Sequence, residues 1–191
     1  DWRQEKEHGG GMILDWGVHL LDQLLLLFAD VPLYSVYATV THVTNQLVDD
    51  GFYTELVFEN GVSAMVEVGT SNFVSLPRWY VLGTDGTAVI EDWQLNGKIV
   101  RASGVDEKDV MPVITAAGLT KTMAPRRDDS IFTEPLPEVK SDVREFYYNV
   151  MAVLEGREES LIRLPQVMRV MKLMEAIGRS AETGEVIKLR L

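Results

Sequence analysis

The chain has 191 residues, no cysteine and a formal net charge of −11, from 18 basic and 29 acidic side chains. The missing cysteines exclude a disulfide framework and fit a reducing, cytoplasmic setting, and the acidic balance argues against a nucleic-acid partner. A hydrophobic fraction of 46% and a charged fraction of 25% are ordinary for a globular protein. We therefore expect residues 1–191 to form a single domain.

The first expected element is a helix in the apolar run Met12–Phe28, within the segment GGGMILDWGVHLLDQLLLLF. The run is short for a membrane span and contains several polar side chains, so we expect a buried core helix and no membrane contact. These polar residues are Asp15, His19, Asp22 and Gln23.

A meander of strands is expected next. Three turn signals, the strongest short-range indication of a hairpin, stand between runs rich in β-branched and aromatic residues: Asn60-Gly61, Asp85-Gly86 and Asn96-Gly97. These runs predict about six antiparallel strands between residues 34 and 103. In one strand an apolar set is expected to face the helices and to alternate with Ser63, Met65 and Glu67; this set is Val62, Ala64, Val66 and Val68.

Residues 104–137 have no sustained period and are expected to form a long excursion over the sheet or its edge, with a strand near 110–115. Asp142 and Glu145 then have the spacing of a capping box. An apolar stripe behind them predicts a buried helix face, formed by Val143, Phe146, Tyr147, Val150, Met151 and Leu154.

Pro165 begins the next expected helix, and Gly184 ends it before a closing strand in EVIKLRL. Its inward residues should be Val167, Val170, Met171, Met174, Ile177 and Ala181. The order of elements predicts an α+β fold, with an open, predominantly antiparallel β-sheet and helices packed on one face.

Asp15 and His19 are the candidate catalytic residues of the first helix. Side chains four residues apart on a helix are neighbours, and a carboxylate beside an imidazole fixes its tautomer, as in a general acid–base. The same spacing also occurs on helix faces that only contact solvent, and in buried pairs that only hydrogen-bond to each other. A metal site would need a third ligand, and neither His8 nor His42 has a spacing that recommends it.

The segment WRQEKEHGGGMILDWGVHLLDQLLLLF resembles the start of the C-terminal domain of the Gfo/Idh/MocA family (glucose–fructose oxidoreductase / inositol dehydrogenase). Members of that family show Trp-Arg, three glycines, D-x-x-x-H on a helix and then LLD. RWYVLGTDGTAVIED is similar to the family's mid-sheet hairpin, and the segments from DVREFYYNVMAVLEGREE to AIGRSAETGEVIKL are similar to its terminal helices. The resemblance covers nearly the whole chain except residues 104–137.

The resemblance implies an NAD(P)-dependent oxidoreductase that acts on a sugar, a polyol or a related hydroxy compound by hydride transfer. In this family an N-terminal Rossmann domain binds NAD or NADP and supplies a lysine from an E-K-P motif, while the second domain supplies the aspartate and histidine. His19 would then exchange a proton with the substrate hydroxyl, and Asp15 would position His19. Arg3 and Gly11 match the family's cleft-edge motif and would lie at the substrate.

The chain departs from the family pattern because no G-x-G-x-x-G follows a strand and no E-K-P occurs. We therefore expect the Rossmann domain to be absent from this chain, and the chain to be the C-terminal domain of a longer enzyme, inactive by itself. Two other hypotheses stay open. One is a non-catalytic dimerisation or ligand-binding module of the same fold, and the other is an NAD-dependent glycosidase of the same family.

The chain is also expected to form a homo-oligomer through the open face of its sheet. The helices can cover only one face of the sheet, and short strands cannot turn every large side chain inward. Met65 and one of Trp79 and Trp93 should therefore lie on the open face, where exposed apolar surface usually marks an interface.

Overall fold

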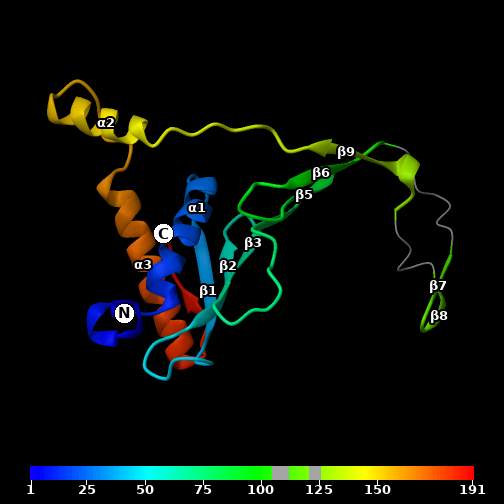
Figure 1. Cartoon of the computed structure of the whole chain (residues 1–191), viewed down its shortest axis with the longest axis horizontal. Coiled ribbons are helices and arrows are strands. Elements are labelled where there is room, and N and C mark those ends of the chain that lie inside the picture. Colours follow the sequence, from blue (N-terminus) through cyan, green and yellow to red (C-terminus); the bar gives the residue numbers. More distant parts are fainter. Residues whose placement is uncertain (105–111, 121–125) are drawn as a thin grey trace. The chain divides into compact units, whose positions relative to one another are not determined.

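The computed structural model describes residues 1–104, 112–120 and 126–191 of the chain. These residues divide into two compact units (Figure 1). The first unit comprises Asp1–Phe73 and Val143–Leu191, and the second comprises Val74–Asp142. The expectation of a single domain over residues 1–191 therefore stays a prediction.

The first unit begins with two 3-10 turns, η1 (Trp2–Gln4) and η2 (Lys6–His8). A π turn, η3 (Ile13–Gly17), then leads directly into the helix α1 (Val18–Leu27). The other helices are α2 (Arg144–Leu154) and α3 (Leu164–Thr183). Pro165 lies in the first turn of α3, and Gly184 ends that helix in the left-handed conformation with φ +70°, as the sequence predicts.

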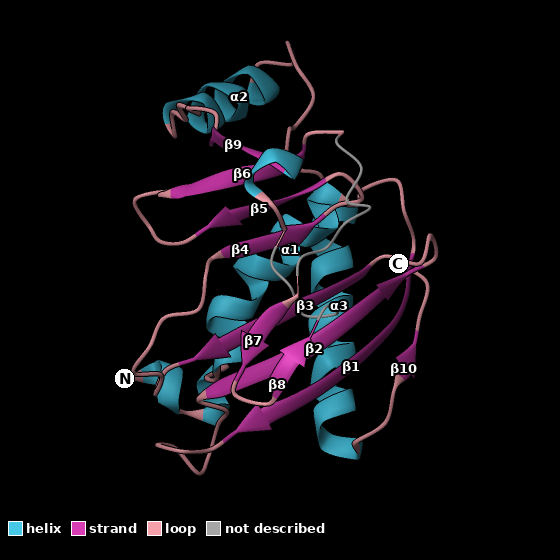
Figure 2. Cartoon of the chain, turned by 90° about the vertical axis from the view of Figure 1, so that its right-hand side faces the viewer, coloured by secondary structure: helices cyan, strands magenta, loops and turns pink. Residues whose placement is uncertain are grey.

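The sheet of the first unit contains β1 (Leu33–Thr41), β2 (Gly51–Phe58), β3 (Ser63–Gly69) and the closing strand β10 (Ile187–Lys188). All neighbours are antiparallel, in the order β10-β1-β2-β3. The predicted Asn60-Gly61 hairpin joins β2 to β3, and Gly61 takes the φ of +84° that favours glycine. Figure 2 shows α1 and α3 on one face of this sheet.

The hydrophobic core of the first unit lies between the sheet and these two helices. Its fully buried side chains include Leu21, Leu33, Phe52, Leu56, Phe58, Leu173 and Ile177. Ser180 joins α3 to the sheet, because its Oγ accepts the N–H of Ala38 at 2.9 Å and donates to the carbonyl of Glu185 at 2.6 Å. The alternation within β3 is confirmed, since Val66 is 6% exposed whereas Met65 is 70% exposed. The inward placement of Val62 is wrong, because this residue lies in the turn before β3 and is 37% exposed.

The second unit has its own antiparallel sheet in the order β4-β5-β6-β9. Its strands are β4 (Trp79–Leu82), β5 (Gly86–Ile90), β6 (Gly97–Ala102) and β9 (Ile131–Pro135). A separate hairpin pairs β7 (Val113–Thr115) with β8 (Gly118–Thr120), and a 3-10 turn, η4 (Asp128–Ser130), precedes β9.

The six strands expected between residues 34 and 103 are present as β1–β6, but they belong to two sheets instead of one meander. The excursion 104–137 supplies β9, which pairs with β6. The strand expected near 110–115 corresponds to β7, while residues 110 and 111 lie outside the described part of the chain. The α+β class, the open antiparallel sheet and the helices on one face are confirmed, and the described residues form no Rossmann domain.

Two expectations about α2 are wrong. Val143 occupies the N-cap position of this helix and no side chain makes a capping hydrogen bond there, so Asp142 and Glu145 do not form the expected box. The predicted apolar face is exposed, with Leu154 at 83% and Tyr147 at 61%, and the buried residues of the helix are Asn149 and Ala152. An amphipathic pattern shows that a helix has an apolar side, but it does not show which surface covers that side.

The expected inward face of α3 is only partly confirmed. Val170, Met174 and Ile177 are buried as predicted, whereas Val167 and Met171 are exposed. The buried residues therefore lie toward the C-terminal half of the helix, where α3 packs on β1.

Candidate active site

Three glycines turn the chain into the helix that carries the candidate site. Gly9 ends η2 in the left-handed conformation, with φ +73°. A Cβ atom on Gly10 would lie 2.5 Å from the carbonyl oxygen of Arg3. Gly11 has φ +111°, and a Cβ there would overlap the carboxylate of Asp49. Glycine at these positions lets the backbone of Arg3 and the carboxylate of Asp49 pack directly against the start of the helix.

The helix begins with the π turn η3 instead of a regular α-helical turn. π turns inside helices are uncommon and are frequent at functional sites. The last residue of the turn, Gly17, lies against the ring of Phe52 on β2, because a Cβ at this position would be 3.2 Å from its Cζ. The wider turn means that the α-helical spacing of Asp15 and His19 is not maintained across it.

Asp15 is bound to Arg3. The Nε–H of Arg3 donates to both carboxylate oxygens, at 3.0 Å to Oδ1 and 3.1 Å to Oδ2. Gly11 connects the same two residues through the backbone, since its N–H donates to the carbonyl of Arg3 at 2.9 Å and its carbonyl accepts the N–H of Asp15 at 3.0 Å. The structure therefore brings three of the four predicted site residues, Arg3, Gly11 and Asp15, into one bonded cluster.

His19 lies in the first turn of α1, after the π turn. Its side chain is exposed, and its carbonyl accepts a hydrogen bond from Nε2 of Gln23 at 3.0 Å. Within the described residues its imidazole makes no hydrogen bond, so the contact with Asp15 that the spacing predicts is not formed. The carboxylate is instead oriented by Arg3, and the imidazole is free to meet a ligand.

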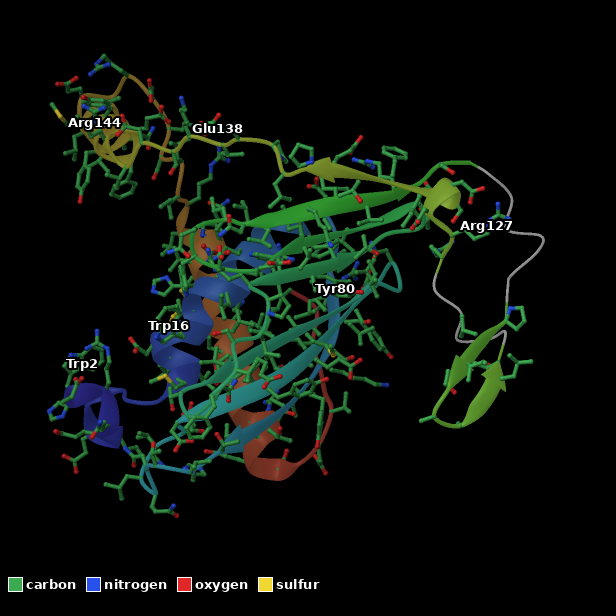
Figure 3. The ribbon with its side chains drawn as sticks, turned by 45° about the vertical axis from the view of Figure 1, so that its right-hand side comes forward. Trp2, Trp16, Tyr80, Arg127, Glu138 and Arg144 are labelled. Carbon is green, nitrogen blue, oxygen red and sulfur yellow. The ribbon has the colours of Figure 1, made fainter. Side chains whose placement is uncertain are left out.

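One aromatic side chain packs on the cluster. The guanidinium of Arg3 lies 4.5 Å from the ring centroid of Trp2, and its Nη1 is 3.6 Å from Oδ1 of Asp1. Figure 3 labels Trp2 on η1 and Trp16 on the π turn, and these residues are 50% and 42% exposed. Arg3 is thus held by a carboxylate and a ring, while its side chain stays 44% exposed.

The loop 42–50 that joins β1 to β2 also contacts the site, and no sequence pattern pointed to it. Asp50 is buried at its end and accepts hydrogen bonds from Oγ1 of Thr41 at 2.8 Å, Oγ1 of Thr44 at 2.9 Å and the N–H of Asn45 at 3.1 Å. It also accepts the N–H of Thr44, and this bond is the main reason why the pKa of Asp50 lies well below its usual value, although burial opposes the shift. The only signal in the sequence is Asp49-Asp50 before Gly51, which is typical of many turns.

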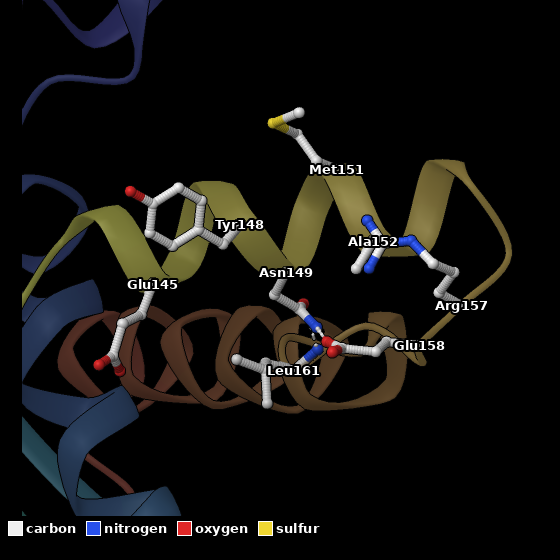
Figure 4. Close-up of a pocket in the computed structure, with 8 residues that line it drawn as sticks. All are labelled: Glu145, Tyr148, Asn149, Met151, Ala152, Arg157, Glu158 and Leu161. Carbon is white, nitrogen blue, oxygen red and sulfur yellow. Dashed lines mark hydrogen bonds between the residues drawn. The ribbon is translucent and has the colours of Figure 1, made fainter.

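A surface pocket with a volume of about 360 Å³ lies on α2 and the segment that follows it (Figure 4). Its lining includes Tyr148, Met151 and Leu161, together with the charged Arg157 and Glu158. The buried amide of Asn149 holds its wall together, donating to Glu158 and Glu159 and accepting the N–H of Leu161, each at 3.0 Å. None of the predicted site residues lines this pocket.

The described residues contain no group of three or more histidine, aspartate or glutamate side chains that could hold a metal ion. No helix in the described ranges is long and apolar enough to cross a membrane. The glycine turn before η3 does not fit the phosphates of a dinucleotide, because Oδ2 of Asp49 already accepts the N–H of Ile13 at 2.9 Å.

Comparison with a family model agrees with the resemblance seen in the sequence. Residues 1–89 match the model described as GFO/IDH/MocA C-terminal domain. Among curated proteins, none matches this sequence.

Several solved structures are similar to the chain. An NAD-binding protein from Listeria innocua is 46% identical with a TM-score of 0.93, over 99% of this chain and 54% of that protein. YvaA from Bacillus subtilis, provisionally assigned as an oxidoreductase, is 18% identical with a TM-score of 0.72, over 94% of this chain and 52% of that one. The WlbA dehydrogenase from Bordetella pertussis, solved with NADH and UDP-GlcNAcA, is 21% identical with a TM-score of 0.60, over 95% of this chain and 46% of that one. The chain spans about half the length of these relatives.

Proposed function

Because this chain belongs to the Gfo/Idh/MocA family, as its C-terminal domain, we propose that it is the substrate-binding and catalytic domain of a longer NAD(P)-dependent oxidoreductase. The proposed substrate is a sugar, a polyol or a related hydroxy compound, and the proposed reaction is hydride transfer. The observation that carries the proposal is the bonded cluster of Arg3, Gly11 and Asp15 at the start of the helix whose next turn presents the exposed His19.

The cofactor would be held by residues outside this chain and would supply the hydride chemistry. This assignment is supported by the misfit between the glycine turn and a pyrophosphate, because Asp49 already bonds to the start of the helix. The Listeria relative is named for NAD binding, which agrees with a nicotinamide cofactor but leaves the choice between NAD and NADP open.

The residues of this chain would act on the substrate side. The imidazole of His19 is exposed and unbonded among the described residues, so it can accept the proton of a substrate hydroxyl or return it. Asp15, whose side chain is 20% exposed, would accept a hydrogen bond from the same hydroxyl region while Arg3 fixes its orientation. Both backbone polar groups of Gly11 are used inside the cluster, so Gly11 would act by allowing the close packing at the cleft edge.

A sugar-like substrate is supported by WlbA, which was solved with a UDP-sugar. The carboxylates at the cluster, Asp1 and Asp15 beside Arg3 and Asp49 at the N–H of Ile13, agree with a hydroxy compound bound through hydrogen bonds. We also propose that the protein forms a homo-oligomer through the open face of the sheet β10-β1-β2-β3, where Met65 is 70% exposed.

The test incubates the full-length protein with NAD or NADP and a panel of sugars, polyols and glycosides, and measures both the reduced nicotinamide and the free sugar released. Stoichiometric reduced cofactor with a hydroxy substrate is the expected result. Release of sugar from a glycoside without net reduction would instead identify the NAD-dependent glycosidase. Neither product with any substrate, although a panel member binds, would identify a non-catalytic module.

A further inference from the structure

The loop 42–50 contacts both backbone segments that carry the candidate site. Near its start, Nδ2 of Asn45 donates to the carbonyl of Gln4 at 3.3 Å, next to Arg3 on η1. Near its end, the carbonyl of Asp49 accepts the N–H of Met12 at 3.1 Å. In Figure 1 this loop is the cyan segment between β1 and β2, close to the dark-blue N-terminal turns. The loop therefore bridges the turn that bears Arg3 and the turn that bears Asp15.

Asp49 makes the closest connection between the loop and the π turn. In addition to the backbone bond at Met12, its Oδ2 accepts the N–H of Ile13 at 2.9 Å. A helix start leaves several N–H groups without partners inside the helix, and a carboxylate there also interacts favourably with the helix dipole. Asp49 thus performs from a distant loop the task that an N-cap residue normally performs from the chain itself.

Asp49 packs closely against the backbone before the π turn. Gly11 is buried, and the carboxylate of Asp49 occupies the space that a side chain at residue 11 would need. The loop is itself fixed, because Asp50 accepts hydrogen bonds from Thr41, Thr44 and Asn45. A rigid loop joined by one carboxylate to Ile13 determines where Asp15, two residues further on, meets Arg3.

We propose that Asp49 is a positioning residue for the Arg3–Asp15 pair, and through that pair for the reaction proposed above, on which the catalytic part of this proposal rests. Without its carboxylate the N–H of Ile13 loses its partner, and the π turn is joined to the loop only by the backbone bond at Met12. The Nε–H of Arg3 then no longer donates to both oxygens of Asp15. Because a displacement of ~1 Å in a reacting group can cost about 10²-fold in rate, such a shift should lower turnover.

The first arm of the test uses residues 1–191 and NMR, and it needs no activity. The exchange rate of the Arg3 Nε–H should rise about tenfold in Asp49→Ala, as expected for one lost hydrogen bond. Asp49→Asn keeps an acceptor for Ile13 and should stay near the wild-type rate. The matched control is Asp30→Ala, an exposed aspartate in the loop after α1, and the β2 amides report whether the fold is intact. An unchanged Arg3 signal in Asp49→Ala would overturn the proposal.

The second arm measures the kinetics of the full-length protein. Asp49→Ala should lower kcat about tenfold or more while KM stays within about threefold, and Asp49→Asn should restore kcat. Wild-type kcat in Asp49→Ala, or failure of a folded Asp49→Asn to restore it, would refute the positioning role in the reaction. His19→Ala is measured beside them. If His19→Ala also turns over normally, the proposed function fails, and the NMR arm alone decides whether Asp49 positions the pair.

Discussion

Arg169 of α3 ties the C-terminal end of α1 to the rest of the first unit. Its Nη1 donates to the carbonyls of Leu25 at 3.2 Å and Ala29 at 3.4 Å, and its Nη2 to those of Phe28 at 3.4 Å and Val31 at 3.3 Å. Burial lowers the pKa of this guanidinium, and its Nε has no hydrogen-bond partner among the described residues. Because α1 carries His19 at its other end, this contact fixes the helix that bears the candidate site.

The cost of removing the guanidinium follows from these contacts. A cation at a partly buried helix C-terminus contributes up to about 2 kcal/mol, and hydrogen bonds from a charged donor contribute about 1.5–3 kcal/mol. The four bonds at Arg169 are longer than the optimum of about 2.9–3.0 Å, so the lower end applies. Arg169→Met keeps the aliphatic stem and should reduce the free energy of unfolding by about 1.5–2 kcal/mol. For a chain of this size the Tm should fall by about 3–8 °C.

The assay is urea and thermal unfolding of residues 1–191, followed by circular dichroism. Arg169→Lys should recover part of the loss, because an ammonium keeps the charge but cannot reach all four carbonyls. The control is Arg163→Met, which removes an ion pair with Glu159 whose side chains are 63% and 83% exposed. This substitution should change the free energy of unfolding by less than about 0.5 kcal/mol. Equal stability of Arg169→Met and wild type, or an equal loss in the control, would refute the reasoning.

Three further predictions concern the same chain. Calorimetry on residues 1–191 should detect no micromolar binding of NAD or NADP, because Asp49 fills the glycine turn; micromolar affinity would contradict the division of roles. Light scattering should report a dimer that Met65→Lys dissociates, since Met65 is 70% exposed on the sheet face opposite the helices, and a monomeric wild type would exclude this interface. Asp50→Asn should destabilise the chain at pH 7, because the lowered pKa of Asp50 stabilises the fold above the ordinary value of about 3.9. This stabilisation is lost as the pH falls through the lower native pKa. The difference in free energy of unfolding between wild type and Asp50→Asn, measured with urea, should therefore shrink below pH ~4. An equal difference at pH 7 and below pH ~4 would argue against this role of Asp50.

Local signals in the sequence predicted most of the secondary structure. Each predicted dipeptide turn joins two antiparallel strands, because a tight hairpin depends on the residues of the turn itself. The alternation of Val66 and Met65 followed from the period of a strand. The division into two sheets did not follow, since β3 and β4 are consecutive in the chain but belong to different sheets, and β9 and β10 pair with strands distant in the sequence.

The sequence predicted which residues form the candidate site, but it did not predict how their side chains contact one another. Helical spacing placed Asp15 beside His19, whereas the π turn and the bond to Arg3 give Asp15 a different partner. Asp49 lies 36 residues from Ile13 in the sequence, and no local pattern reports a contact over that separation. The exposed face of α2 is the same kind of case, because what covers a helix is decided by tertiary packing.

The central claim, that His19 exchanges the proton of the substrate hydroxyl, is tested most directly by the steady-state kinetics of His19→Ala in the full-length protein. The loss of a general acid–base predicts a fall in kcat of about 10²–10⁴-fold with little change in KM. Asp15→Asn should lower kcat less, because Arg3 can still hold an amide oxygen at that position. Near-wild-type kcat in both variants would contradict the claim and leave the cluster of Arg3, Gly11 and Asp15 a purely structural role.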